Sequence, residues 1–175
     1  MVIWLIGLSG SGKTTLGTEI ARQLRARHPN TVLLDGDTMR QVFAFDQGND
    51  PYTMEGRRIN AERITALCEM LDRQGIHVVC CILSIFADMR LNNRTRFSRY
   101  FEIFMDAPMQ ALRQRDVKGL YAAADAGKTT NVVGVHIPFE RPMGADLVID
   151  SSNDTADIPA LAEQALSLTG LWKSS

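Results

Sequence analysis

A glycine-rich segment near the start of the chain has the residue types and spacing of a phosphate-binding loop. Residues 7–14 read G-L-S-G-S-G-K-T, which fits G-x-x-x-x-G-K-[ST], and they directly follow an apolar run at 2–6. Glycines let backbone N–H groups turn toward a phosphate, and the helix expected next adds its positive N-terminal end. Lys13 is expected to reach the β- and γ-phosphates, and the Thr14 hydroxyl to bind Mg²⁺. The sequence therefore predicts ATP or GTP as a ligand of the loop residues Gly10, Ser11, Gly12, Lys13, Thr14 and Thr15.

A second polar group, D-G-D-x-x-R, follows the next apolar run at 31–34. It would lie where a parallel strand delivers its C-terminal end, the edge at which open α/β sheets collect ligands. Asp35 is expected to orient Mg²⁺ or its water shell, Asp37 to accept the proton of an attacking hydroxyl, and Arg40 to hold an anionic acceptor. A helix N-cap is the alternative for any one of these residues. Because the sequence lacks the guanine-reading N-K-x-D of GTPases, the group favours a kinase.

Length and composition indicate one soluble globular domain, 1–175. Hydrophobic residues make up 45% and charged residues 22% of the 175 residues. A net charge of −1 gives no broad electrostatic footprint for nucleic acid or an anionic membrane, so neither is expected as a partner. The three cysteines have no zinc-ligand spacing and their odd number gives no disulfide framework. This cysteine pattern predicts a reducing, cytoplasmic location. The apolar start of the chain is shorter than a membrane span and has no basic flank, which predicts a buried first strand.

Short apolar runs alternate with longer periodic stretches along the chain. Strands are predicted at 2–6, 31–34, 76–83, 100–105 and 146–149, and helices near 13–27, from about 37, and near 56–74, 87–97, 108–115 and 156–168. Such alternation is typical of a parallel sheet covered on both faces. The predicted fold is α/β, a P-loop kinase-like three-layer sandwich with a central parallel sheet.

Two segments interrupt this alternation. Residues 46–51 form a polar turn cluster, and residues 116–142 contain three glycines and two prolines without a convincing period. A loop of that length inside a compact domain is usually a lid or a binding element. Since the segment still contains apolar and aromatic residues, we expect 116–142 to be a lid and not a disordered excursion.

Several motifs together resemble the adenylyl-sulfate (APS) kinase family. They are the loop at 7–15, L-D-G-D-x-x-R at 34–40, R-x-x-N at 57–60, Ser84 after the third predicted strand, and R-D-V-K-G-L-Y at 115–121. The match spans nearly the full chain. It implies that Mg²⁺ and ATP are used to phosphorylate the ribose 3′-hydroxyl of adenylyl sulfate, and that the protein forms a homodimer.

The resemblance also implies roles for individual residues. Arg115 would lie near ATP at the start of the lid, and Tyr52 would stack on the acceptor base. Around the acceptor nucleotide it places Asp37, Arg40, Arg57, Asn60, Leu83, Ser84, Lys118, Asn131 and Val132. The family assigns its matching serine as a phosphorylated intermediate. A hydrogen bond to the substrate is the simpler role for Ser84, since direct in-line transfer needs no enzyme nucleophile.

The acceptor side departs from the sulfate-assimilation pattern. The usual N-F-T-G-I-D-S-P-Y-E is N-V-V-G-V-H-I-P-F-E at 131–140, the usual I-S-P-Y-R is L-S-I-F-A at 83–87, and Gly56 replaces an acid. Because stacking of a base on an aromatic ring contributes about 1–3 kcal/mol, Val132 in place of Phe would lower acceptor affinity by about 5- to 150-fold. The same segments resemble the cytidine diphosphoramidate kinases of capsule modification. We therefore expect a cytidine diphosphate derivative as preferred acceptor, with adenylyl sulfate as the alternative.

Two further classes remain as alternatives. A catalytically silent nucleotide-binding module is disfavoured because Lys13, Thr14, Asp35 and Asp37 are all present. A kinase for a sugar acid or an antibiotic is disfavoured by R-D-V-K-G-L-Y and by the R-x-x-N pair.

Overall fold

The centre of the molecule is a sheet of parallel strands. The computed structural model describes residues 1–43, 50–116, 118–153 and 156–171. In these ranges the sheet has the order β2-β3-β1-β4-β5, and every pair of neighbours is parallel. The strands are β1 (Val2–Ile6), β2 (Thr31–Asp35), β3 (His77–Ile82), β4 (Tyr100–Asp106) and β5 (Leu147–Asp150). The predicted parallel sheet is confirmed.

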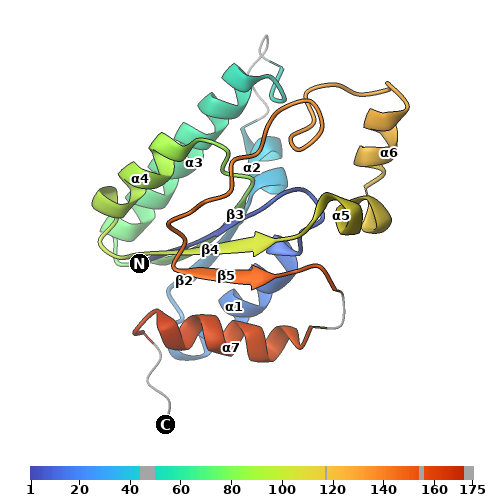
Figure 1. Cartoon of the computed structure of the whole chain (residues 1–175). Helices are drawn as coiled ribbons and strands as arrows, with labels where there is room; N and C mark the ends of the chain where they lie inside the picture. The colour runs from blue at the N-terminus through green and yellow to red at the C-terminus, as the bar shows by residue number, and fades with distance from the viewer. Residues whose placement is uncertain (44–49, 117, 154–155, 172–175) are drawn as a thin grey trace.

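Helices cover both faces of this sheet (Figure 1). One face carries α1 (Lys13–Arg27) and α7 (Ile158–Leu168), which pack on alternate strand residues such as Ile3 and Leu5. The other face carries α2 (Gly36–Val42), α3 (Met54–Arg73) and α4 (Ala87–Arg96). Val2, Trp4 and Ile6 point to that side. Because both faces are covered, β1 is apolar throughout and fully buried.

The first helix lies close to the sheet because residue 17 has no side chain. A Cβ atom at Gly17 would lie 2.1 Å from the Cys81 Sγ atom on β3. Any larger residue would push α1 away from the strand, and with it the loop that precedes the helix. Gly17 therefore helps to fix the position of residues 7–14.

Segment 116–142 differs from the expectation in containing a helix, α6 (Leu120–Asp125), which follows α5 (Met109–Arg115). Gly119 begins it with φ of 62°, and the Asp116 carboxylate accepts hydrogen bonds from the Tyr121 and Ala122 N–H groups. Tyr121 and Ala124 then pack in a buried cluster with Leu112 and Val132. Six residues are too few to give a readable helical period, so the sequence did not reveal α6.

The other predicted elements lie within a few residues of the observed ones. Of the predicted turn at 46–51, residues 46–49 lie outside the described residues. No described helix is both long enough and apolar enough to span a membrane.

Candidate functional site

The candidate site lies at the edge where β1, β2 and β3 end. Ile6 pairs in register with Ile82, and Asp35 pairs with Cys81, so the three strands finish at the same level. Residues 7–14 follow β1, α2 follows β2, and Ser84 follows β3. This is the edge of an open α/β sheet at which ligands bind.

The glycine-rich loop has the backbone conformation that its sequence predicts. Gly10 and Gly12 have φ of 80° and 90°, in the left-handed region that favours glycine. Gly12 is also the N-cap of α1, and no side chain caps that helix. The first N–H groups of α1 are therefore available to a phosphate.

Lys13 folds back over this loop. Its Nζ atom donates to the Leu8 carbonyl oxygen at 2.7 Å and to the Ser11 Oγ atom at 3.4 Å. Burial lowers the pKa of Lys13 from 10.5 to about 8. Since even partial burial disfavours the charged ammonium, an anionic phosphate would be a favourable partner for it.

Thr14 and Asp35 together supply oxygen atoms suited to Mg²⁺. The Thr14 hydroxyl donates to Asp35 Oδ2 at 2.7 Å, which directs its lone pairs away from Asp35. Asp35 Oδ1 accepts from the Asp37 and Thr38 N–H groups and caps α2. In the described part of the chain, no group of three or more His, Cys, Asp or Glu residues is arranged to hold a metal ion by itself. A hydroxyl and a carboxylate are oxygen donors that fit Mg²⁺, which keeps several waters and binds substrate phosphates.

Asp37 lies between two cationic side chains. Its carboxylate forms ion pairs with Arg40, one turn along α2, and with Lys118, which lies between α5 and α6. Two cations stabilise the carboxylate charge. The Lys118 ion pair also brings segment 116–142 into contact with the start of α2, next to the end of β2.

A pocket opens beside Asp37, with a volume of about 410 Å³ including its mouth to solvent. Its described charged lining residues, Arg40 and Arg57, are both cationic. The remaining lining combines apolar side chains with a few polar groups. The lining residues are Gly36, Arg40, Pro51, Arg57, Asn60, Ala61, Ile64, Ile82, Leu83, Ser84, Ile85 and Phe86.

Tyr52 lies against these two arginines. The guanidinium carbons of Arg40 and Arg57 are 5.8 and 5.6 Å from the centre of its ring. The side chain of Tyr52 is half exposed, with 51% of its surface accessible. An exposed ring beside cationic groups can stack on the base of an anionic nucleotide.

Arg57 connects the pocket to segment 116–142. It donates to the carbonyl oxygens of Tyr52 at 2.9 Å and Asn131 at 2.8 Å. Burial, with a smaller effect from Arg40, lowers the pKa of Arg57. A partly desolvated guanidinium attracts an anion more strongly than an exposed one does.

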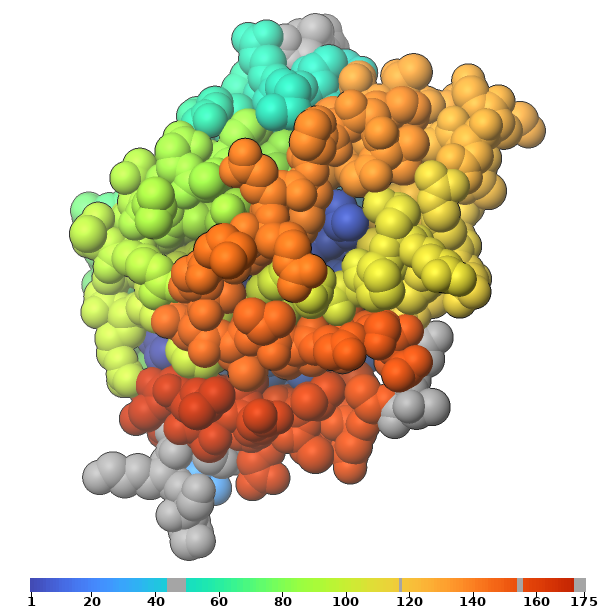
Figure 2. Space-filling model, viewed as in Figure 1, coloured from blue at the N-terminus to red at the C-terminus, as the bar shows by residue number. Residues whose placement is uncertain are grey.

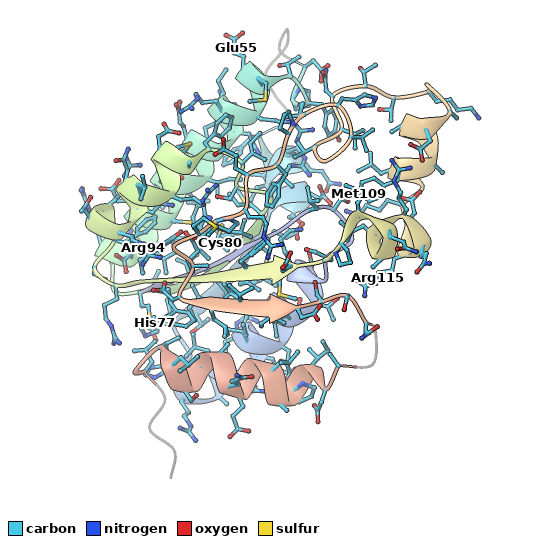
Figure 3. The ribbon with its side chains drawn as sticks, viewed as in Figure 1. Glu55, His77, Cys80, Arg94, Met109 and Arg115 are labelled. Atoms are coloured by element: carbon cyan, nitrogen blue, oxygen red, sulfur yellow. The ribbon has the colours of Figure 1, made fainter. Side chains whose placement is uncertain are left out.

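The structure brings most of the predicted acceptor residues together. Arg40, Arg57, Asn60, Leu83 and Ser84 line the pocket. Cation–π contacts, ion pairs and a hydrogen bond to Arg40, Arg57 or Asp37 link four further residues to the pocket: Tyr52, Asp37, Lys118 and Asn131. Val132 lies outside this lining, in the buried cluster with Leu112 and Tyr121, with 3% of its surface accessible. Arg115 is the last residue of α5 (Figure 3).

Sequence reasoning did not identify several residues around the pocket. Ile64 is an apolar residue with no signal beyond its helical position. Arg58 lies over the Phe86 ring at 4.2 Å, a contact that the acceptor-side motif at 83–87 does not indicate. Trp4 contacts Ser84 from the middle of an apolar strand. Only the three-dimensional structure shows these contacts.

The surface is hollowed near the start of the chain. Figure 2 shows N-terminal atoms, in blue, at the floor of a recess between the orange segment after α6 and the yellow region of α5. The recess leaves part of the chain's beginning visible from this side.

Comparison with known proteins shows to which family the chain belongs. Residues 1–150 match the family described as adenylylsulphate kinase. The chain belongs to that family. It is therefore a phosphotransferase with an alcohol group as acceptor, as the motifs predicted. The α/β fold of P-loop kinases is likewise confirmed.

Individual members of the adenylylsulphate kinase family differ in their named acceptors. A probable adenylyl-sulfate kinase of Pseudomonas aeruginosa is 37% identical over 156 residues, covering 89% of this chain and 72% of the relative. A cytidine diphosphoramidate kinase of Campylobacter jejuni is 39% identical over 151 residues, covering 86% of each chain. The Mycobacterium tuberculosis APS kinase, solved with AMPPNP and APS, has a TM-score of 0.84 at 32% identity, with 95% of each chain covered.

Proposed function

We propose that this protein transfers the γ-phosphoryl group of ATP to the ribose 3′-hydroxyl of a small anionic nucleotide. The observation that carries the proposal is the juxtaposition of two sites. A phosphate loop with Lys13 lies at the end of β1, and a pocket lined by Arg40 and Arg57 lies at the ends of β2 and β3. Asp37 stands beside that pocket and is paired with Arg40.

On the donor side, Gly10, Ser11, Gly12 and Thr15 would hold the phosphates of ATP, with Arg115 near the nucleotide. Thr14 would bind Mg²⁺ directly, and Asp35 would orient the Thr14 hydroxyl and the water shell of the ion. When bound, Mg²⁺ neutralises charge on the phosphates. Lys13 would move from the Leu8 carbonyl to the β- and γ-phosphates.

On the acceptor side, the residues align the nucleotide and neutralise its charge. Arg40, Arg57 and Lys118 attract its anionic groups, and Tyr52 stacks on its base. Asp37 accepts the proton of the 3′-hydroxyl as that oxygen attacks the γ-phosphorus. The bond from the γ-phosphorus to the β,γ-bridging oxygen breaks, and ADP leaves with that oxygen. Phosphoryl transfer depends mainly on such alignment and charge stabilisation.

The preferred acceptor in this proposal is a cytidine diphosphate derivative, cytidine diphosphoramidate, and adenylyl sulfate is the alternative. The Campylobacter jejuni relative supports the first, and the Pseudomonas aeruginosa and Mycobacterium tuberculosis proteins support the second. Residue 132 offers no aromatic ring for stacking on the acceptor base, because it is a valine buried in the cluster with Leu112 and Tyr121. A pyrimidine requires less stacking area than a purine, which favours the cytidine derivative.

The test is a side-by-side assay with Mg-ATP and each acceptor, using the Lys13→Ala variant as the inactive control. We expect a higher kcat/KM for the cytidine derivative, and ³¹P NMR of the product should place the new phosphate on the 3′-oxygen. A large preference for adenylyl sulfate would reject the pyrimidine assignment. Absence of turnover with every nucleotide acceptor would favour a silent binding module.

The proposal includes three further expectations about the whole protein. Segment 116–142 would act as a lid of a single domain, 1–175, since Lys118 and the Asn131 carbonyl already contact the acceptor side. The protein would be a homodimer, which light scattering can test. With the cytidine acceptor it would act in the cytoplasm in capsule modification.

A further inference from the structure

Ser84 is held by a hydrogen bond from the strand that leads into the phosphate loop. The Trp4 indole Nε1 atom on β1 donates to Ser84 Oγ at 3.1 Å, and Trp4 is only 2% exposed. An indole N–H can donate but cannot accept. Ser84 Oγ must therefore be the acceptor in this pair, and its own hydrogen is left for another partner.

The backbone of Ser84 is constrained as well. Its φ is 53°, in the left-handed region that residues other than glycine rarely adopt. The Arg90 Nη1 atom, from α4, donates to the Ser84 carbonyl oxygen at 2.7 Å, and Arg90 is only 8% exposed. Two buried side chains thus fix both the backbone and the hydroxyl of a residue that lines the pocket.

We propose that Trp4 is a positioning residue, which sets the Ser84 hydroxyl as a hydrogen-bond donor to an anionic oxygen of the acceptor. This inference rests on the proposed function. In the described residues the Ser84 hydroxyl hydrogen has no protein acceptor, and the pocket gives it access to a ligand. Trp4 lies on β1, the strand that leads into the phosphate loop. A single strand, β1, therefore supports both the donor and the acceptor side.

The same geometry disfavours Ser84 as a nucleophile. A serine nucleophile needs a neighbouring base to take its proton. The described lining of the pocket contains neither a carboxylate nor an imidazole, and its charged residues are Arg40 and Arg57. The Asp37 carboxylate beside the pocket is paired with Arg40 and Lys118, not with Ser84. A hydroxyl among cations is suited to donate to an anion that the same cations attract.

The test compares Trp4→Phe, which keeps a ring and removes the N–H donor, with the wild-type enzyme. We expect the KM for the acceptor to rise about 2- to 12-fold, the range for one neutral hydrogen bond, with the KM for ATP unchanged. In a Ser84→Ala background the Trp4→Phe change should have no further effect on the acceptor KM. Phe97→Leu is the matched control, because Phe97 packs on the Trp4 ring at 6.1 Å. It should leave the acceptor KM unchanged.

The proposal would be overturned if Trp4→Phe changed the KM for the acceptor and the KM for ATP equally and Phe97→Leu had the same effect. Trp4 would then act through packing alone. Additive effects of Trp4→Phe and Ser84→Ala would do the same, as would a phosphate on Ser84 by intact mass after incubation with Mg-ATP. If Trp4→Phe is too unstable to assay, the Trp4 indole N–H resonance should shift in Ser84→Ala; an unchanged resonance would overturn the contact. Failure of the proposed function can be distinguished from failure of the Trp4 proposal, because in the first case the wild-type enzyme itself would turn over no nucleotide acceptor.

Discussion

Lys118, in the turn between α5 and α6, forms an ion pair with Asp37 in the first turn of α2. The two residues are far apart in sequence, and their contact joins segment 116–142 to the end of β2. Arg40 pairs with the same carboxylate from the next turn of α2. The ion pair therefore places a residue of segment 116–142 at the carboxylate proposed to act on the acceptor hydroxyl.

Asp37→Asn should reduce turnover far more than ATP affinity. The amide keeps the shape of the side chain but cannot accept the hydroxyl proton, and loss of a general base typically lowers kcat by about 10²- to 10⁴-fold. Steady-state kinetics together with calorimetric titration of Mg-AMPPNP would separate the two effects. Equal losses in kcat and nucleotide affinity would instead make Asp37 a binding residue.

Lys118→Gln should impair acceptor use and leave the fold intact. The Lys118 side chain is 64% exposed, and an exposed ion pair contributes about 1 kcal/mol or less to stability. Contact with an anionic substrate is worth more, and we expect kcat/KM for the acceptor to fall by about 10- to 150-fold. Thermal unfolding should change little. A lower Tm with unchanged kinetics would assign Lys118 a structural role only.

Nucleotide affinity should weaken as the pH rises through about 8. Burial lowers the pKa of Lys13 to about 8, so the free protein carries the positive charge below that pH and loses it above. A bound triphosphate stabilises the protonated form, so binding above pH 8 requires proton uptake. Titration of Mg-AMPPNP between about pH 6.5 and 9.5 would measure the break in affinity.

Lys13→Arg is the control for this pH dependence. Arginine keeps its charge over the whole range, so any affinity that the variant retains should show no break near pH 8. A break of the same size in the variant would assign the titration to another group.

The sequence predicted those parts of the site that depend on local chemistry. The glycines at positions 10 and 12 determine the backbone conformation of the loop at 7–14. Asp35 ends β2 and Asp37 follows it, and the direction of a parallel strand determines at which edge of the sheet these carboxylates lie. Among contacts between distant elements, only the family resemblance gave any guidance, since it grouped Lys118 and Asn131 with Asp37 and Arg57. Contacts of single apolar residues left no signal in the sequence. Trp4 appears in the sequence only as one more apolar residue of β1, and the position of Val132 in the cluster of Leu112 and Tyr121 depends on the unpredicted helix α6.

Gly56 offers a further test of how the acceptor pocket is built. A Cβ atom at this position would lie 2.2 Å from the Asp50 carbonyl oxygen and 2.9 Å from the Pro51 Cα atom. The Asp50 carbonyl oxygen also accepts from the Thr53 N–H and hydroxyl, and Thr53 caps α3. Because these obstacles are backbone atoms, a methyl group at residue 56 must displace the turn that carries Tyr52.

Gly56→Ala should therefore raise the KM for the acceptor with little change in the KM for ATP, because the Tyr52 ring would leave its place beside Arg40 and Arg57. Overpacking of this kind costs about 1–3 kcal/mol, so unfolding should also occur at lower denaturant concentration. Gly144→Ala is the matched control, since a Cβ atom there meets nothing within 4 Å. If Gly56→Ala shifts the two KM values equally, or behaves as Gly144→Ala does, the turn at 50–53 does not position the ring for the acceptor.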